Sequence, residues 1–260
     1  MTAAGMNILL GVILLLLNLT AAADASSQSS PLRLGYLEHP GSALCLAAGS
    51  KGFFRAEGVR VRLVRFHDTE RGLAALAAGG IDAGAFAVGE TLRQIAEGKE
   101  LRIIAGGGTA RGADPLADLD EAATLEQESG GIVVAVAAPP RAPGKEVLVR
   151  LVTALIRAYQ SLQKEPGGIG HGAVHFDPNP DYRRIERLWR FHDLQGEKRP
   201  RDFLANHVYE EIYCDALDRL MDRTGTKDGV LQKLFSEAVC VPDCCPPVAK
   251  KRDKNKGGSR

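Results

Sequence analysis

The sequence predicts an α/β fold in which helices flank a mostly parallel sheet and a helical region follows. Between Leu32 and Ala105, short apolar strands alternate strictly with helical segments. This order is typical of a parallel sheet built from strand–helix units. A buried strand at Ile132–Ala137 and a helix at Glu146–Lys164 extend the pattern, and the apolar side chains of that helix fall on one broad face.

Each element of the first part has its own local signal. The apolar runs that predict strands are Leu32–Leu37, Val59–Val64, Ile81–Phe86 and Leu101–Ala105. In the second run apolar residues alternate with arginines, as they do in a strand with one wet face. The helices between these strands are expected to begin at Gly41, at Asp68 or Thr69 as an N-cap, and at Val88.

The later elements are expected to be mainly helical. A short helix is predicted at Leu116–Gln127 and a loop at Gly167–Pro180. Further helical segments are predicted at Tyr182–Phe191, Pro200–Met221 and Gly229–Ala238.

Composition and motifs argue against several classes of function. The 260 residues are 45% hydrophobic, and 33 Lys and Arg residues face 32 Asp and Glu residues. This balance does not indicate a nucleic-acid partner. The sequence has no Gly-x-Ser-x-Gly elbow, phosphate-binding loop or His-Glu-x-x-His motif, so we predict that it is not an enzyme and has no cofactor. His171, His175 and Asp177 share a Gly-rich loop, which is more simply interpreted as surface than as a metal site.

The first 25 residues resemble an export signal. The segment from Ile8 to Leu19 is almost entirely apolar and is short for a membrane span. Small residues follow, and cleavage after Ala23 or Ala25 fits the usual rule for signal peptides. We therefore predict a periplasmic or otherwise exported protein. The alternative is an uncleaved N-terminal membrane anchor, because the segment lacks Lys and Arg before the apolar run.

The predicted export means that some of the cysteines could form disulfides. Cys45 lies on an apolar helical face and is interpreted as inert core. Cys214, Cys240, Cys244 and Cys245 could form a disulfide in an oxidising compartment. The sequence does not choose among their pairings.

The segment from Leu32 to Ala105 resembles a known family on several motifs that occur in the right order. These are Gly35-Tyr36, Lys51-Gly52-Phe53-Phe54, Glu57-Gly58-Val59, Leu76 through Ala83 (LAAGGIDA) and Ile95-Ala96-Glu97-Gly98. The family is that of periplasmic solute-binding proteins of ABC importers, in the nitrate, sulfonate, taurine and thiamine-precursor (NMT1-like) group. The resemblance implies a lobe of the type 2 periplasmic-binding-protein fold.

The resemblance also implies an organisation from which the second half departs. In the family a whole second lobe follows the fourth strand, whereas only a short polar segment follows it here. We expect a signal peptide at 1–25, the first part of the lobe at 31–105, and a connector that replaces the second lobe at 106–131. A returning strand and helix at 132–165, a helical C-terminal region at 166–248 and a disordered basic tail at 249–260 complete the chain.

The expected binding site lies beyond the carboxyl ends of the strands, where open α/β sheets bind their ligands. The loops there contribute six candidate ligand-binding residues: Tyr36, His39, Ser42, Asp68, Thr69 and Thr91. For Ser42 and Thr69 the alternative role is that of a helix cap. No metal-binding residue is predicted.

The resemblance implies a solute-binding component of an ABC-type importer. Such a protein would capture a small organic or anionic solute and deliver it to a membrane permease. A homodimer could complete the site if one lobe is missing. The alternative function is that of a shortened, non-transport relative that acts as a sensor or partner-binding module. The third hypothesis is an enzyme, which would need a bound metal or cofactor.

Overall fold

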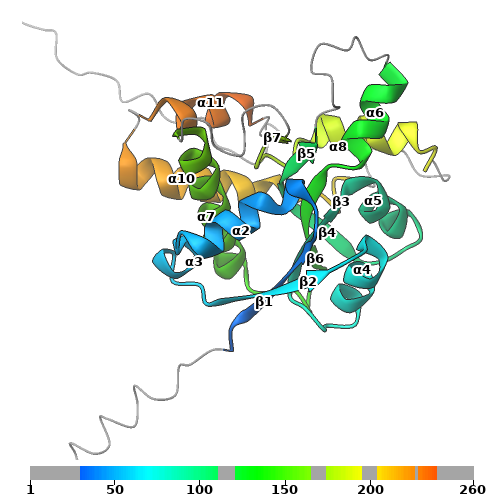
Figure 1. Cartoon of the computed structure of the whole chain (residues 1–260), viewed down its shortest axis with the longest axis horizontal. Coiled ribbons are helices and arrows are strands. Elements are labelled where there is room, and N and C mark those ends of the chain that lie inside the picture. The colour runs from blue at the N-terminus through cyan, green and yellow to red at the C-terminus, as the bar shows by residue number, and fades with distance from the viewer. Residues whose placement is uncertain (1–29, 111–120, 165–173, 195–203, 226–227, 239–260) are drawn as a thin grey trace, which may run out of the picture. The chain divides into compact units, whose positions relative to one another are not determined.

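A computed structural model of the chain describes residues 30–110, 121–164, 174–194, 204–225 and 228–238 (Figure 1). Residues Leu32 onward form one compact unit. The predicted signal segment, the basic tail and Cys240, Cys244 and Cys245 lie outside the described residues. Within the described part of the chain, no helix is both long and apolar enough to cross a membrane.

The main sheet has five strands in the order β2-β1-β3-β6-β4. Their bounds are β1 Leu32–Leu37, β2 Val61–Phe66, β3 Ala83–Ala87, β4 Leu101–Gly106 and β6 Ile132–Ala137. β1 pairs in parallel with β2 and β3, whereas β6 pairs antiparallel with both β3 and β4. Four strands therefore share one direction and β6 opposes them. The expectation of a mostly parallel sheet is confirmed, with one antiparallel strand that the alternation of elements did not reveal.

Helices cover both faces of this sheet (Figure 1). One core cluster joins the sheet to α2 (Ala43–Ser50), α3 (Phe53–Ala56), α7 (Lys145–Lys164), α10 (Glu210–Thr224) and α11 (Gly229–Glu237). The other joins it to α4 (Thr69–Ala77), α5 (Val88–Ala96) and α8 (Tyr182–Phe191).

The central strand β6 explains why the two clusters are separate. All six of its residues are buried. Ile132, Val134 and Val136 belong to the first cluster, whereas Val133 and Ala135 belong to the second. Because successive side chains of a strand point to opposite faces, one apolar run supplies both cores.

A second, two-stranded sheet lies beyond the end of β4. β5 (Gly108–Ala110) pairs antiparallel with β7 (Val174–Phe176), and we call this pair the ribbon. The backbone after β7 is attached to the main sheet, because Gly106 N–H donates to Pro178 O at 2.9 Å and Asp177 N–H donates to Gly107 O at 2.8 Å. The expectation of a loop at Gly167–Pro180 is therefore wrong for β7. A three-residue strand carries too little periodicity to be recognised, and its partner is remote in the sequence.

Other boundaries differ by a few residues from those expected. The helix predicted at Leu116–Gln127 is α6, Glu121–Ser129, and the segment predicted from Pro200 contains α10 from Glu210. A short 3-10 helix, η2 (Pro40–Ser42), precedes α2. Residues 107–131 form only β5 and α6 in their described part, together with a short turn.

A buried carboxylate ties the helical layer together. Glu57 follows α3, and its side chain is fully buried. It accepts hydrogen bonds from Arg157 on α7 at 2.8 Å and from Arg223 on α10 at 2.7 Å, and Arg219 lies 3.6 Å away. Although burial acts to raise it, these hydrogen bonds lower the pKa of Glu57. The charge is thus compensated on three sides.

Candidate functional site

The carboxyl ends of β1, β2, β3 and β4 lie at one edge of the main sheet, because these strands share one direction. Ligands of open α/β sheets bind at this edge. Two separate hollows lie along it, one beyond β1 and β2 and one beyond β4.

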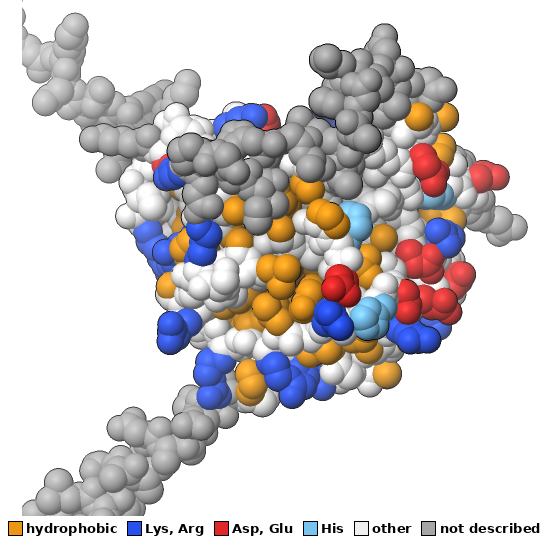
Figure 2. Space-filling model, in the orientation of Figure 1, with side chains coloured by type: hydrophobic (Ala, Val, Ile, Leu, Met, Phe, Trp, Pro, Cys, Tyr) orange, Lys and Arg blue, Asp and Glu red, His pale blue; other side chains and the backbone are white. Residues whose placement is uncertain are grey.

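The first hollow has a volume of about 340 Å³. Its lining is Tyr36, Leu37, Glu38, His39, Pro40, Leu46 and Arg65. Leu46 on α2 is 41% exposed, and Figure 2 shows hydrophobic side chains gathered in the middle of the face on which α2 lies. We call this space the β1–β2 hollow.

His39 closes the start of η2 beside this hollow. Its Nδ1 accepts the backbone N–H of Gly41 at 3.0 Å, which requires that this nitrogen carry no proton. Burial lowers the pKa of His39, which favours the neutral ring. His39 is therefore at once a helix cap and a wall of the hollow.

Three more of the six predicted binding residues form structural hydrogen bonds at this edge. Asp68 is the N-cap of α4 and accepts from Arg71 N–H at 2.8 Å, as the sequence predicted. Thr69 Oγ1 accepts the N–H of Ala87 at 3.4 Å. Thr91 is fully buried and donates to Ala87 O at 2.8 Å. Thr91 has no exposed surface with which to contact a solute.

Ser42 is buried under the ribbon. It is 1% exposed, and its Oγ has no hydrogen-bond partner among the described residues. Beside it the backbones of η2 and β5 meet: a Cβ built on Gly108 would lie 2.8 Å from Gly41 Cα, and one on Gly41 would collide with Gly108 O. The middle of the edge is therefore closed by backbone packing.

The six predicted residues consequently do not converge on one cavity. Tyr36 and His39 share the β1–β2 hollow, and the other four line none of the hollows at this edge. Their role in binding stays a prediction.

The second hollow has a volume of about 410 Å³ and lies between the ribbon, α6 and α8. We call it the ribbon hollow. Its lining is strongly polar: Thr109, Thr124, Gln127, Glu128, His175, Asp177, Asp181, Arg184 and Arg187. Its volume is in the range of small-molecule sites.

Arg184 forms the inner wall of the ribbon hollow. Its side chain is 14% exposed. Its Nη2 donates to Thr109 Oγ1 at 3.1 Å and to Glu128 O at 3.5 Å, and its Nε lies 3.8 Å from Glu128 Oε2. A Cβ on Gly131 would lie 2.7 Å from this guanidinium. Arg184 therefore connects α8 to both β5 and α6.

Asp177 lies where the chain leaves the ribbon. Its Oδ1 accepts the N–H of Asn179 at 2.9 Å, and the residue is partly buried. Burial raises the pKa of Asp177, against the opposing effects of that N–H and of the charges on Arg184 and His175. These opposing effects do not fully offset the effect of burial.

Sequence reasoning missed most of this hollow. His175 and Asp177 were noticed only as part of a loop, and Thr109, Glu128 and Arg184 gave no signal. The sequence did contain one signal for this region, the run Asp177-Pro178-Asn179-Pro180-Asp181. Asx and Pro residues in succession are typical of a turn that ends in a helix cap. Asp181 is indeed the N-cap of α8.

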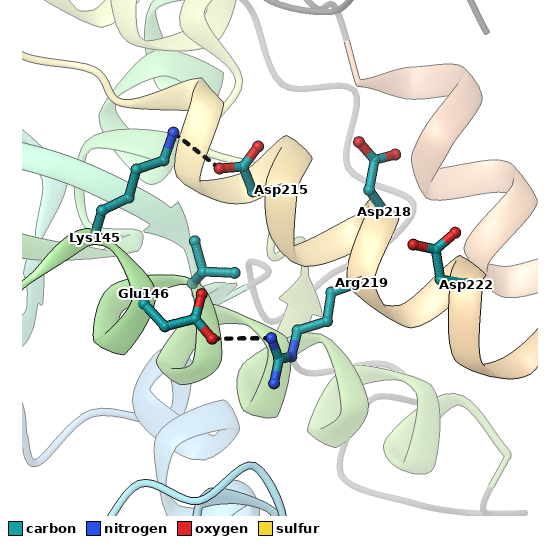
Figure 3. Close-up of a pocket in the computed structure, with 7 residues that line it drawn as sticks. Lys145, Glu146, Asp215, Asp218, Arg219 and Asp222 are labelled. Atoms are coloured by element: carbon teal, nitrogen blue, oxygen red, sulfur yellow. Dashed lines mark hydrogen bonds and ion pairs between the residues drawn. The ribbon is translucent and has the colours of Figure 1, made fainter. Parts of the chain in front are cut away.

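Another hollow lies away from this edge, between α7 and α10 (Figure 3). It measures about 530 Å³, and ion pairs cross its floor: Lys145–Asp215 at 3.0 Å and Glu146–Arg219 at 3.0 Å. Asp218 and Asp222 point away from Arg219 in Figure 3. Four carboxylates and two cations line it, and burial together with Asp215 and Asp222 raises the pKa of Asp218. Because it lies away from the edge where open α/β sheets bind their ligands, it is a weaker candidate for a solute.

Cysteine and metal chemistry add little at these sites. Burial raises the pKa of Cys45 to about 12, which agrees with an inert core cysteine. Cys214 is buried in α10, and the predicted pairing with the C-terminal cysteines stays untested. No group of three or more metal-ligating side chains occurs in the described part of the chain.

Comparison with known proteins gives matches of two kinds. A model of the NMT1-like family matches residues 25–110. No curated protein sequence matches the chain.

Several solved structures resemble the fold. A protein from Bordetella bronchiseptica RB50 is 15% identical with a TM-score of 0.54, over 74% of this chain and 98% of that one. A Candida albicans gene product, described as having the generic periplasmic binding protein fold, is 10% identical with a TM-score of 0.52, over 69% and 96%. The periplasmic nitrate-binding protein of Synechocystis PCC 6803 is 10% identical with a TM-score of 0.51, over 74% and 89%. This chain therefore has the periplasmic-binding-protein fold, and its residues 25–110 match the NMT1-like family.

Proposed function

We propose that this protein is an exported solute-binding protein of the kind that serves ABC importers, and that it holds its solute in the ribbon hollow. The observation that carries the proposal is the polar hollow at the carboxyl edge of the sheet, with Arg184 held between Thr109 and Glu128 as its wall. The fold and the family match of residues 25–110 agree with this role.

In this proposal α6, α8 and the ribbon take the place of the second lobe. Two-lobe binders close over a solute and remove it from water. Here the hollow is fixed by hydrogen bonds from Arg184 and by the backbone contacts of residues 177–179 with β4. We therefore expect binding with little closure and modest affinity. Delivery to an ABC permease follows from the same role, and a second copy of the chain could cover the open side.

The test is a thermal-shift screen of the purified protein from Ser26 onward. The panel contains nitrate, taurine, alkanesulfonates, aromatic acids and aminopyrimidines. A solute that binds only the folded state must raise the melting temperature in a saturable way. Thr124→Trp, on the exposed side of α6 that lines the hollow, should abolish the rise.

Ala122→Trp is the matched control, because Ala122 is exposed on the same helix and does not line the hollow. This variant should keep the response. If Thr124→Trp and the parent respond alike, the solute binds elsewhere, and the proposed site is wrong.

A second function is favoured by one observation, the contact of Gly41 with Gly108 across the middle of the edge. A sheet edge that backbone packing closes in this way agrees with a shortened relative that acts as a sensor or partner-binding module. A flat response to the whole panel up to millimolar concentration would favour this function over solute capture.

A further inference from the structure

The C-terminal ends of α6 and α8 bring a serine and a histidine together. Ser129 is the last residue of α6, His192 is the C-cap residue of α8, and Ser129 Oγ lies 2.7 Å from His192 Nε2. Both residues are partly buried. They lie 63 positions apart in the sequence, so no local motif indicates that they meet.

We assign the serine as the donor of this hydrogen bond. Within the described residues, His192 Nε2 is the only acceptor for the Ser129 hydroxyl. Burial and the charge of Arg93 lower the pKa of His192, and the charge of Glu126 opposes them. These effects favour a neutral ring with an unprotonated Nε2, which is the form that can take a proton from a serine.

The first turn of α5 fits closely against this pair. The three helices α5, α6 and α8 pack against one another (Figure 1). A Cβ built on Gly89 would collide with Ser129 Oγ and would lie 2.9 Å from His192 Nε2. The first turn of a helix presents N–H groups that have no partner inside the helix, and it is the positive end of the helix dipole. Negative charge that develops at Ser129 would therefore be stabilised by α5.

We propose that Ser129 is a nucleophile that accepts acyl groups from small activated esters, with His192 as its general base. The pair combines a hydroxyl, a base within hydrogen-bond reach and a helix N-terminus beside the reacting oxygen. Within the described residues no carboxylate accepts a hydrogen bond from His192, so we expect a slow reaction. This activity is separate from solute capture, and either proposal can be wrong while the other stands.

The reaction has two steps that balance. Ser129 Oγ bonds to the carbonyl carbon of the ester while the hydroxyl proton passes to His192 Nε2. The bond from that carbon to the leaving oxygen breaks, and the alcohol leaves with the proton from His192. Water then attacks the acyl-serine, which releases the acid and restores the hydroxyl.

The test treats the purified protein with p-nitrophenyl acetate and, separately, with a fluorophosphonate, and maps the modified peptides by mass spectrometry. Both reagents should modify Ser129 faster than any other serine. Ser129→Ala should abolish this modification, and His192→Ala should slow it about 100-fold, the lower end of general-base contributions. Added imidazole should restore part of the rate in His192→Ala. A histidine that only holds α6 against α8 would show no such rescue.

Ser50→Ala is the matched control. Ser50 is an exposed serine near the end of α2, and its hydroxyl donates to the backbone carbonyl of Ala47 rather than to a histidine. This variant should react as the parent does.

The pH profile gives a second readout. The charged groups that act on His192 are Arg93 on α5 and Glu126 on α6. The rate should rise with pH through the lowered pKa of His192 and then level off. Arg93→Gln should move the midpoint upward, because it removes a positive charge that opposes protonation of the ring. If neither reagent modifies Ser129, or if Ser129→Ala reacts as fast as the parent, the proposal is wrong.

Discussion

Two regions of this molecule each remove a carboxylate from water, one fully and one in part, and the pKa values of the two shift in opposite directions. Glu57, between α3, α7 and α10, is surrounded by Arg157, Arg219 and Arg223. Asp177, at the ribbon, is only partly buried: it accepts one backbone N–H, from Asn179, and the charges of Arg184 and His175 act on it. The first arrangement fixes the packing of three helices. The second gives the carboxylate weaker compensation beside the ribbon hollow, and its pKa stays raised.

The comparison predicts its largest effect at Glu57. Glu57→Gln should lower the free energy of unfolding by about 3 kcal/mol, because three arginines lose the charge that holds them together. Chemical denaturation measures this directly. Glu146→Gln is the control: Glu146 also pairs with Arg219, but its side chain is 58% exposed, and the loss of stability should be much smaller than for Glu57→Gln. Equal losses for the two variants would contradict the structural role assigned to Glu57.

A second prediction asks whether the ribbon is a fixed part of the fold. Gly41→Ala should destabilise the protein by about 2 kcal/mol, because the new methyl group collides with Gly108 O. Gly229→Ala is the control, since nothing lies within 4 Å of a Cβ there. That variant should have nearly unchanged stability. If Gly41→Ala is as stable as the parent, η2 and β5 do not pack as described.

The smallest effect, and the one with the opposite sign, is expected at Asp177. Its raised pKa means that the folded state holds this proton more tightly than the unfolded chain does, so its ionisation opposes folding as the pH rises above about 4. Asp177→Asn removes this cost and keeps an acceptor for Asn179 N–H. The variant should be slightly more stable than the parent at pH 7, and the difference should shrink as the pH falls toward 4.

Glu57 should behave in the reverse way, and so should Asp82, which pairs with Arg33 at 2.7 Å. Because arginine partners lower their pKa values, their contribution to stability is complete above about pH 5 and is lost as the pH falls. Unfolding free energies of the parent and of Asp177→Asn, measured between pH 3 and pH 8, test both signs. A variant that is less stable than the parent at pH 7 would contradict the account of Asp177.

Local signals were enough to predict the region that contains Glu57, and they were not enough for the ribbon. The Asp68 cap, the strand Leu32–Leu37 and the buried strand Ile132–Ala137 each depend on neighbouring residues in the sequence, and all are confirmed. The direction of β6 is set by where it pairs, which its own apolar run does not encode.

The ribbon hollow has no such local basis. Thr109 and Arg184 bond across 75 positions of sequence, and β7 has three residues. The six residues predicted from loop positions were chosen as if the middle of the sheet edge were open. The contact between Gly41 and Gly108 closes it, and this contact depends on how β5 packs.

The most direct test of solute capture in the ribbon hollow is backbone NMR of the ¹⁵N-labelled protein, titrated in turn with nitrate, taurine, an alkanesulfonate, an aromatic acid and an aminopyrimidine. The account predicts saturable shifts in the amides of Thr109, Gly131 and Arg184, with small changes at Tyr36 and His39. Shifts confined to the β1–β2 hollow, or no saturable shift with any solute, would contradict it.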